Sequence, residues 1–140
     1  PDHQVETMDM VQAKLCLLFT AGRCTGAQEI AASRLAMALY GGSVASRLFL
    51  NVREKQSLCY YCSSSYTSVT GCMMVDSGVE PANAEKAEQA ILKELNDLVN
   101  GPITEEELEN SRRGILSGRW RTASPVWRAG ILPRLPGAAR

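Results

Sequence analysis

The feature that most restricts the fold of this chain is a change of hydrophobic period at Leu58. Before it, apolar residues recur with the spacing of a helix, most clearly between residues 26 and 40. After it, Leu58–Thr67 and Val69–Ser77 are rich in Tyr, Cys, Val, Ser and Thr, which is typical of strands. These two runs predict antiparallel strands joined by a tight turn near Thr67 and Ser68. A chain with both periods must pack helices on a sheet, which is the α+β class.

Local signals predict one strand and one helix ahead of this change. Lys14–Thr20 is a short apolar run, and it predicts a strand that is partly buried on both faces. Thr25-x-x-Gln28 has the pattern of a capping box, in which the two residues satisfy each other's backbone donors. It predicts a helix from Gly26 to Tyr40, with Gly41 as the C-terminal glycine.

Three further helices are expected. A short one follows over Val44–Arg53, and another opens at Pro81, a first-turn proline, and closes at Gly101. The last has the clearest start signal, the capping box Thr104-x-x-Glu107. The resulting order predicts an antiparallel sheet that is covered on one face by helices.

The chain divides into three parts by composition. Residues 1–12 are a polar leader or linker, and a chain that opens at Pro1 is expected to be a piece of a longer protein. Residues 13–117 hold all the predicted elements and form one α+β domain. Residues 118–140 contain five arginines, three prolines and two tryptophans. This tail is either a basic nucleic-acid-binding arm or a segment foreign to the domain, and we favour the second interpretation.

Charge and hydropathy exclude several classes of protein. The formal net charge is zero, so no overall basic field favours binding to nucleic acid or acidic lipid. No apolar run approaches the roughly 18 residues that a membrane-spanning helix needs. The five cysteines are odd in number and lie in apolar or strand-like segments, which suits reduced thiols in the cytoplasm better than a disulfide framework.

Metal and nucleophilic sites are not evident in the sequence. Cys59 and Cys62 form a single C-x-x-C pair, and the one histidine, His3, lies in the polar leader. Residues three apart on a regular strand point to opposite faces, so the two sulfur atoms should diverge and serve as packing groups. We therefore expect no metal site and no catalytic residues here, and the chain alone is predicted to be inactive.

Arg53 and Tyr60 are the candidate binding residues. Arg53 ends a predicted helix and Tyr60 lies near the start of a predicted strand, so the loop between them is able to bring both to one edge. A guanidinium fork and a phenol are suitable donors to a peptide carbonyl or an oxyanion. The alternative is structural, with Arg53 closing a helix and Tyr60 half-buried in the sheet.

The segment GGSVASRLFLNVREKQSLCYYCSSSY, residues 41–66, resembles the insulinase (pitrilysin, processing-peptidase) family of zinc metallopeptidases, in the second-half or C-terminal type of domain. That family shows a glycine pair, Ser-x-Leu-Phe, Arg-Glu-Lys and a Leu-small-Tyr strand. A Thr-x-x-Glu-capped helix comes later, and the resemblance extends over residues 9–117. The sequence of the strand, CYYCSSSY, looks most like that of bacterial partner subunits that lack zinc ligands.

This resemblance implies that two similar half-domains have different roles. Zinc is held in the other half by an inverted His-x-x-Glu-His motif, which this chain lacks. Arg53 and Tyr60 match the residues that contact the peptide backbone near that zinc. Cys59 replaces the usual Gly or Ala before the tyrosine. The half-domain is expected to be incomplete at its C-terminus, because the family pattern is lost near Ser117.

Three functions follow as hypotheses. The first is a substrate-binding, non-catalytic half of a zinc metallopeptidase that acts on cytoplasmic peptides, with zinc in a homologous half-domain or partner subunit. The alternative is a structural or assembly subunit derived from the same family. A third is a thiol redox module that uses Cys59 and Cys62.

Overall fold

The computed structural model describes residues 3–7, 9 and 11–122. It therefore contains the start of the predicted tail, where the last helix continues to Thr122, while residues 123–140 lie outside the described part. The described elements are β1 (Ala13–Thr20), α1 (Ala27–Tyr40), η1 (Leu48–Lys55), β2 (Cys59–Thr67), β3 (Cys72–Val79), η2 (Pro81–Asn83), α2 (Ala84–Asn100) and α3 (Glu105–Thr122).

The three strands form one antiparallel sheet in the order β1-β3-β2. The predicted antiparallel pair is confirmed, but its turn lies later than expected, over residues 68–71. Gly71 explains the shift: its backbone φ of 69° is in the left-handed region that favours glycine. Its N–H donates to the Thr67 carbonyl at 2.8 Å and closes the turn.

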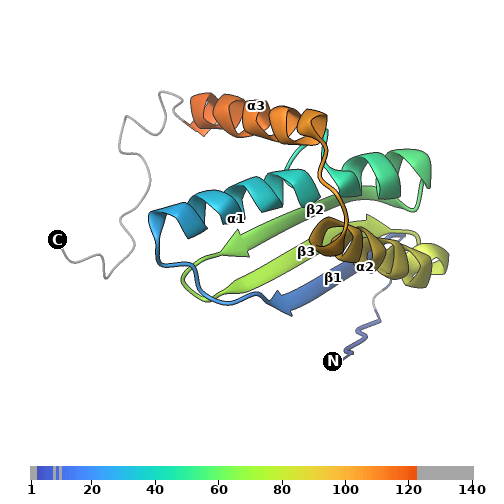
Figure 1. Ribbon diagram of the computed structural model, residues 1–140. Coiled ribbons are helices and arrows are strands. Elements are labelled where there is room, and N and C mark those ends of the chain that lie inside the picture. The colour runs from blue at the N-terminus through green and yellow to red at the C-terminus, as the bar shows by residue number, and fades with distance from the viewer. Residues whose placement is uncertain (1–2, 8, 10, 123–140) are drawn as a thin grey trace.

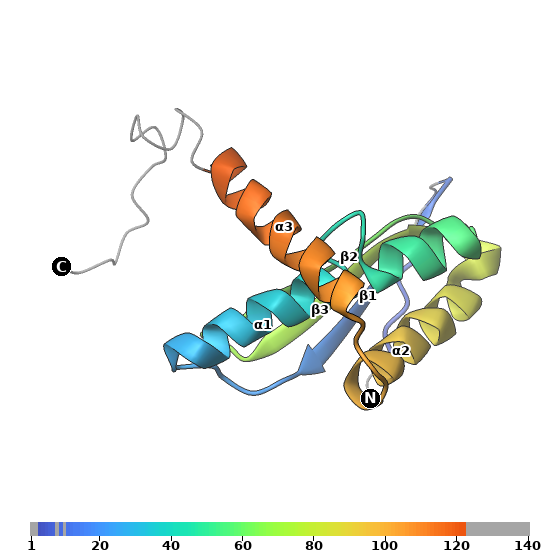
Figure 2. The ribbon, with the colours of Figure 1, turned by 45° about the horizontal axis from the view of Figure 1, so that its top comes forward.

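The helices cover one face of the sheet, as predicted (Figure 1). In the turned view α3 crosses α1, so it forms a further layer outside the first (Figure 2). β1 was expected to be partly buried on both faces, and that prediction was wrong. Its residues alternate between half-buried and exposed, and Leu18 on the open face is 70% exposed. The exposed positions are Lys14, Cys16, Leu18 and Thr20, and the helices among the described residues all lie on the other face of the sheet (Figure 1).

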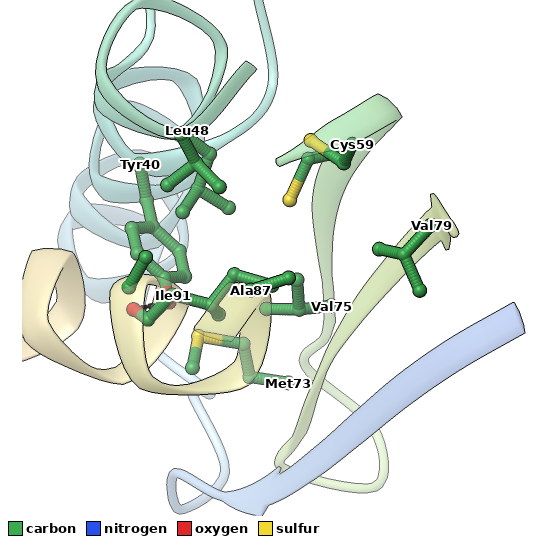
Figure 3. Close-up of a cluster of buried hydrophobic side chains, with 11 residues drawn as sticks. Tyr40, Leu48, Cys59, Met73, Val75, Val79, Ala87 and Ile91 are labelled. Atoms are coloured by element: carbon green, nitrogen blue, oxygen red, sulfur yellow. Dashed lines mark hydrogen bonds between the residues drawn. The ribbon is translucent and has the colours of Figure 1, made fainter. Parts of the chain in front are cut away.

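The core lies between the sheet and the covering helices (Figure 3). Tyr40 from α1 is fully buried and donates its phenol proton to the Ile91 carbonyl of α2 at 2.9 Å. This bond lets a polar tip enter an apolar cluster without losing a partner. The other fully buried apolar side chains come from η1, β3 and α2: Leu48, Val52, Val75, Val79, Ala87 and Ile91.

The capping box of α3 is confirmed in both directions. The Glu107 N–H donates to Thr104 Oγ1 at 3.2 Å, and the Thr104 N–H donates to Glu107 Oε2 at 2.8 Å. The cap predicted for α1 was wrong by one residue. Glu29, not Gln28, accepts the Thr25 and Gly26 N–H groups, because α1 begins at Ala27 and its third residue is therefore Glu29.

Two predicted helices differ in form from expectation. The helix at Val44–Arg53 is the π-helix η1, which begins only at Leu48, since residues 42–46 form turns stabilised by serine side chains. The helix predicted to open at Pro81 starts as the 3-10 turn η2 and continues as α2. Gly101 ends α2 as expected.

Candidate functional site

Arg53 lies in the last turn of η1 and reaches the surface, with its side chain 38% exposed. Its guanidinium carbon stands 4.6 Å from the centre of the Phe49 ring, one turn earlier on the same helix. Its Nη1 is also 3.6 Å from Oε1 of Glu54, an exposed ion pair that contributes little free energy. The aromatic ring therefore limits where the guanidinium points, while its outer donors stay accessible.

Tyr60 is the second residue of β2 and is 46% exposed. The pairing register skips it: Cys59 pairs with Val79 and Tyr61 pairs with Gly78, so Tyr60 is the extra residue of a β-bulge. Its phenol donates to Glu80 Oε1 at 3.1 Å. This hydrogen bond to a carboxylate raises the pKa of Tyr60 above its ordinary value.

The structure brings Arg53 and Tyr60 to the same end of the sheet, where their side chains pair with different partners, Glu54 and Glu80. η1 runs into β2 through a short connection in which the Leu58 N–H donates to the Val52 carbonyl at 3.2 Å. The Arg53 charge also contributes to lowering the pKa of Cys59, the neighbour of Tyr60. We call Arg53, Tyr60 and Glu80 the Arg–Tyr edge.

Sequence reasoning missed Glu80 and the role of Phe49. Glu80 follows β3 directly, and its closeness to Tyr60 depends on the register that pairs Val79 with Cys59. That register is not visible in the sequence. The signal for Phe49 was available, because residues four apart share one face of an α-helix and the π-helix keeps this pair together.

The sulfur atoms of Cys59 and Cys62 were predicted to diverge, and this prediction was wrong. The bulge at Tyr60 adds a residue, so both thiols point to the covered face, where they are 9% and 7% exposed. Figure 3 shows Cys59 directed toward the core cluster. A hydrogen bond from Cys62 is the main cause that lowers the pKa of Cys59, and the same contact and burial raise the pKa of Cys62.

The part of the chain that the structure describes contains neither a metal-binding cluster nor a membrane-spanning helix. No group of three or more His, Cys, Asp or Glu side chains is placed to hold a metal ion there. These residues therefore do not fit the zinc that the resemblance implies for the family. None of the described helices has the length and apolar character to cross a membrane.

Comparison with known proteins gives one family. The family model described as the peptidase M16 inactive domain, a name that corresponds to the insulinase family, matches residues 1–115. The chain is 33% identical over 112 residues to a probable inactive metalloprotease, YmfF, of Bacillus subtilis, covering 80% of this chain and 26% of that protein. It is 34% identical over 103 residues to an uncharacterised zinc protease, YmxG, of the same organism, covering 72% and 25%.

The fold has solved counterparts as well. A conserved protein from Enterococcus faecalis superposes with a TM-score of 0.75 at 31% identity, covering 86% of this chain and 29% of that one. The chain thus spans between a quarter and a third of the length of these three proteins.

Proposed function

Because this chain belongs to the peptidase M16 family as an inactive domain, we propose that it is the peptide-binding, non-catalytic half of a zinc metallopeptidase. The observation that carries the proposal is the Arg–Tyr edge. A guanidinium and a phenol, both partly exposed, stand at one end of a sheet in residues that match the family pattern. The proposed role of this edge is to hold a peptide backbone for a zinc centre on another half.

Each residue of the Arg–Tyr edge has a distinct task in this proposal. Arg53, oriented by Phe49, offers two parallel N–H donors to a peptide carbonyl. Tyr60 offers one O–H donor, which in the free domain is given to Glu80. Substrate binding requires that the phenol exchange this carboxylate for the carbonyl oxygen, so Glu80 keeps Tyr60 ordered and competes with the peptide.

Zinc belongs to a homologous half-domain or partner subunit in this proposal. The names of the Bacillus subtilis relatives support the division, since one is a probable inactive metalloprotease and the other a zinc protease. We place the assembly in the cytoplasm, because all five cysteines are free thiols.

The test is peptide turnover by the protein reconstituted with its zinc-bearing half, using Arg53→Ala and Tyr60→Phe. Loss of one positioned donor to a reacting carbonyl lowers kcat by about 100-fold. Arg113→Ala and Tyr61→Phe are matched controls that should leave turnover unchanged. Arg113 is an exposed arginine on α3 paired with Glu109, and the Tyr61 phenol is partly exposed but donates to Asp76 instead of Glu80.

Two results would decide against the proposal. Unchanged turnover in Arg53→Ala and Tyr60→Phe would make the domain a structural or assembly subunit of the same family. One stoichiometric zinc bound by this chain alone would contradict the assignment of zinc to the other half.

A further inference from the structure

The thiols of Cys59 and Cys62 form a pair that the proposed function does not use. Both are buried on the covered side of β2, and Tyr60 lies between them as the bulge residue. The register that skips Tyr60 puts both side chains on the same face of β2, and hydrogen bonding within the pair is the largest influence on the pKa of each thiol. Two buried thiols on the same face, so close along one strand, can react with each other as well as pack.

The bulge shortens the distance that a disulfide must span. Cys59 pairs with Val79 and Cys62 pairs with Ser77, so the two cysteines lie across from residues only two apart on β3. Two residues of strand extend about 6.8 Å, at the upper end of the Cα separations that disulfides bridge. On a regular strand, three residues would extend about 10 Å and place the sulfur atoms on opposite faces.

The hydrogen bonds around the pair favour Cys59 as the reactive thiolate. Ser77 lies beside both cysteines, but its hydroxyl already donates to the Tyr61 carbonyl at 2.9 Å. Cys62 is therefore the donor that stabilises a Cys59 thiolate, with the Arg53 guanidinium as a nearby positive charge. Cys59 is the first residue of an edge strand, next to the connection from η1, and it is 9% exposed against 7% for Cys62.

We propose that Cys59 and Cys62 are a reversible oxidation site that closes a disulfide across the Tyr60 bulge. Hydrogen peroxide is the oxidant. The Cys59 thiolate attacks one peroxide oxygen, the O–O bond breaks, and the sulfenic acid of Cys59 and one hydroxide form. The Cys62 sulfur then attacks the Cys59 sulfur, the S–O bond breaks, and the released hydroxide takes the Cys62 proton as water. Two electrons pass from the thiols to the peroxide.

The experiment is oxidation of the folded protein with hydrogen peroxide in a Cys16→Ser, Cys24→Ser, Cys72→Ser background, which leaves the pair itself unaltered. After alkylation of remaining thiols, trypsin releases the segment of residues 56–86 with only Cys59 and Cys62 in it. The expected result is a peptide lighter by two hydrogen atoms that takes up no alkylating agent. Dithiothreitol should restore both thiols.

Two single variants test the order of the steps. In Cys62→Ser, Cys59 should stop at the sulfenic acid, which dimedone traps. In Cys59→Ser, Cys62 should remain reduced over the same time. The proposal is overturned if both thiols of the unaltered pair stay alkylatable after peroxide treatment, if only disulfides between molecules form, or if Cys62 oxidises equally fast without Cys59. Retained far-UV circular dichroism checks that each variant is folded.

Discussion

The phenol of Tyr60 donates to the Glu80 carboxylate at 3.1 Å, which joins the start of β2 to the residue after β3 by side chains. The carboxylate raises the pKa of Tyr60 above 10.0, because ionising the phenol would remove the donated proton and place two negative charges side by side. This bond sets the resting state of the Arg–Tyr edge.

Glu80→Gln should lower the pKa of Tyr60 toward its ordinary value, because the amide carries no charge and accepts a weaker hydrogen bond. Ultraviolet titration of tyrosinate checks this, with the contribution of Tyr60 taken as the difference between Glu80→Gln and the double variant Glu80→Gln/Tyr60→Phe. An unchanged Tyr60 titration would show that the Glu80 contact is not formed in solution.

The ion pair between Arg47 and Glu107 should make the attachment of α3 sensitive to acid. Arg47 Nε donates to Glu107 Oε1 at 2.8 Å, and this bond is the main cause that lowers the pKa of Glu107 below 4.5. A carboxyl with a lower pKa in the folded state stabilises the fold above its unfolded pKa, and the stabilisation disappears as pH falls through the folded pKa.

Glu107→Gln should therefore reduce the free energy of unfolding at neutral pH by about 1–3 kcal/mol, since a charge-assisted bond and part of a helix cap are lost. Urea unfolding should show that this difference from the parent protein shrinks as the pH is taken down to about 3. Glu109→Gln is the control, because its pair with Arg113 is exposed and should contribute less than about 1 kcal/mol. Equal effects of the two substitutions would contradict the prediction.

Gly71 and Gly22 allow a comparison of two glycines with similar backbone conformation. Both have positive φ, 69° and 78°, so alanine is strained at either position by about 1–2 kcal/mol. A Cβ on Gly71 would also stand 2.6 Å from the Gly22 carbonyl carbon, whereas a Cβ on Gly22 would have open space. Gly71→Ala should thus lower the thermal midpoint clearly more than Gly22→Ala, and equal midpoints would exclude the close approach.

Changing Ser111 on α3 to alanine should stabilise the protein. Its hydroxyl oxygen is buried and has no hydrogen-bond partner among the described residues, so folding removes it from water without compensation. Ser111→Ala should raise the free energy of unfolding by about 1 kcal/mol in urea titration. Ser117→Ala, at an exposed position on the same helix, is the control, and a loss of stability on changing Ser111 would show that its hydroxyl is satisfied.

Much of the fold could be predicted because its signals are local. The α3 capping box uses residues three apart, and the change of period at Leu58 separates helices from strands without knowledge of the rest of the chain. The one-sided cover of the sheet followed from the order of these elements.

The details of the Arg–Tyr edge could not be predicted because they depend on pairing between strands. The prediction assumed that side chains alternate regularly between the two faces of β2, and it therefore placed Cys59 and Cys62 on opposite faces. The bulge at Tyr60 breaks this alternation and puts both cysteines on one face, and only the register with β3 reveals the bulge. The same register brings Glu80 to Tyr60, and the sequence could name Tyr60 but not its partner.

The strand order has a consequence for how the chain folds. β2 and β3 are joined by a four-residue turn, whereas β1 must pair with β3 across the whole of α1, η1 and β2. Closing that long loop costs more chain entropy than closing the hairpin, so β1 should join a hairpin that already exists. Pulsed hydrogen exchange during refolding should protect the β2–β3 amides before those of β1, and the first strand made would be the last to dock.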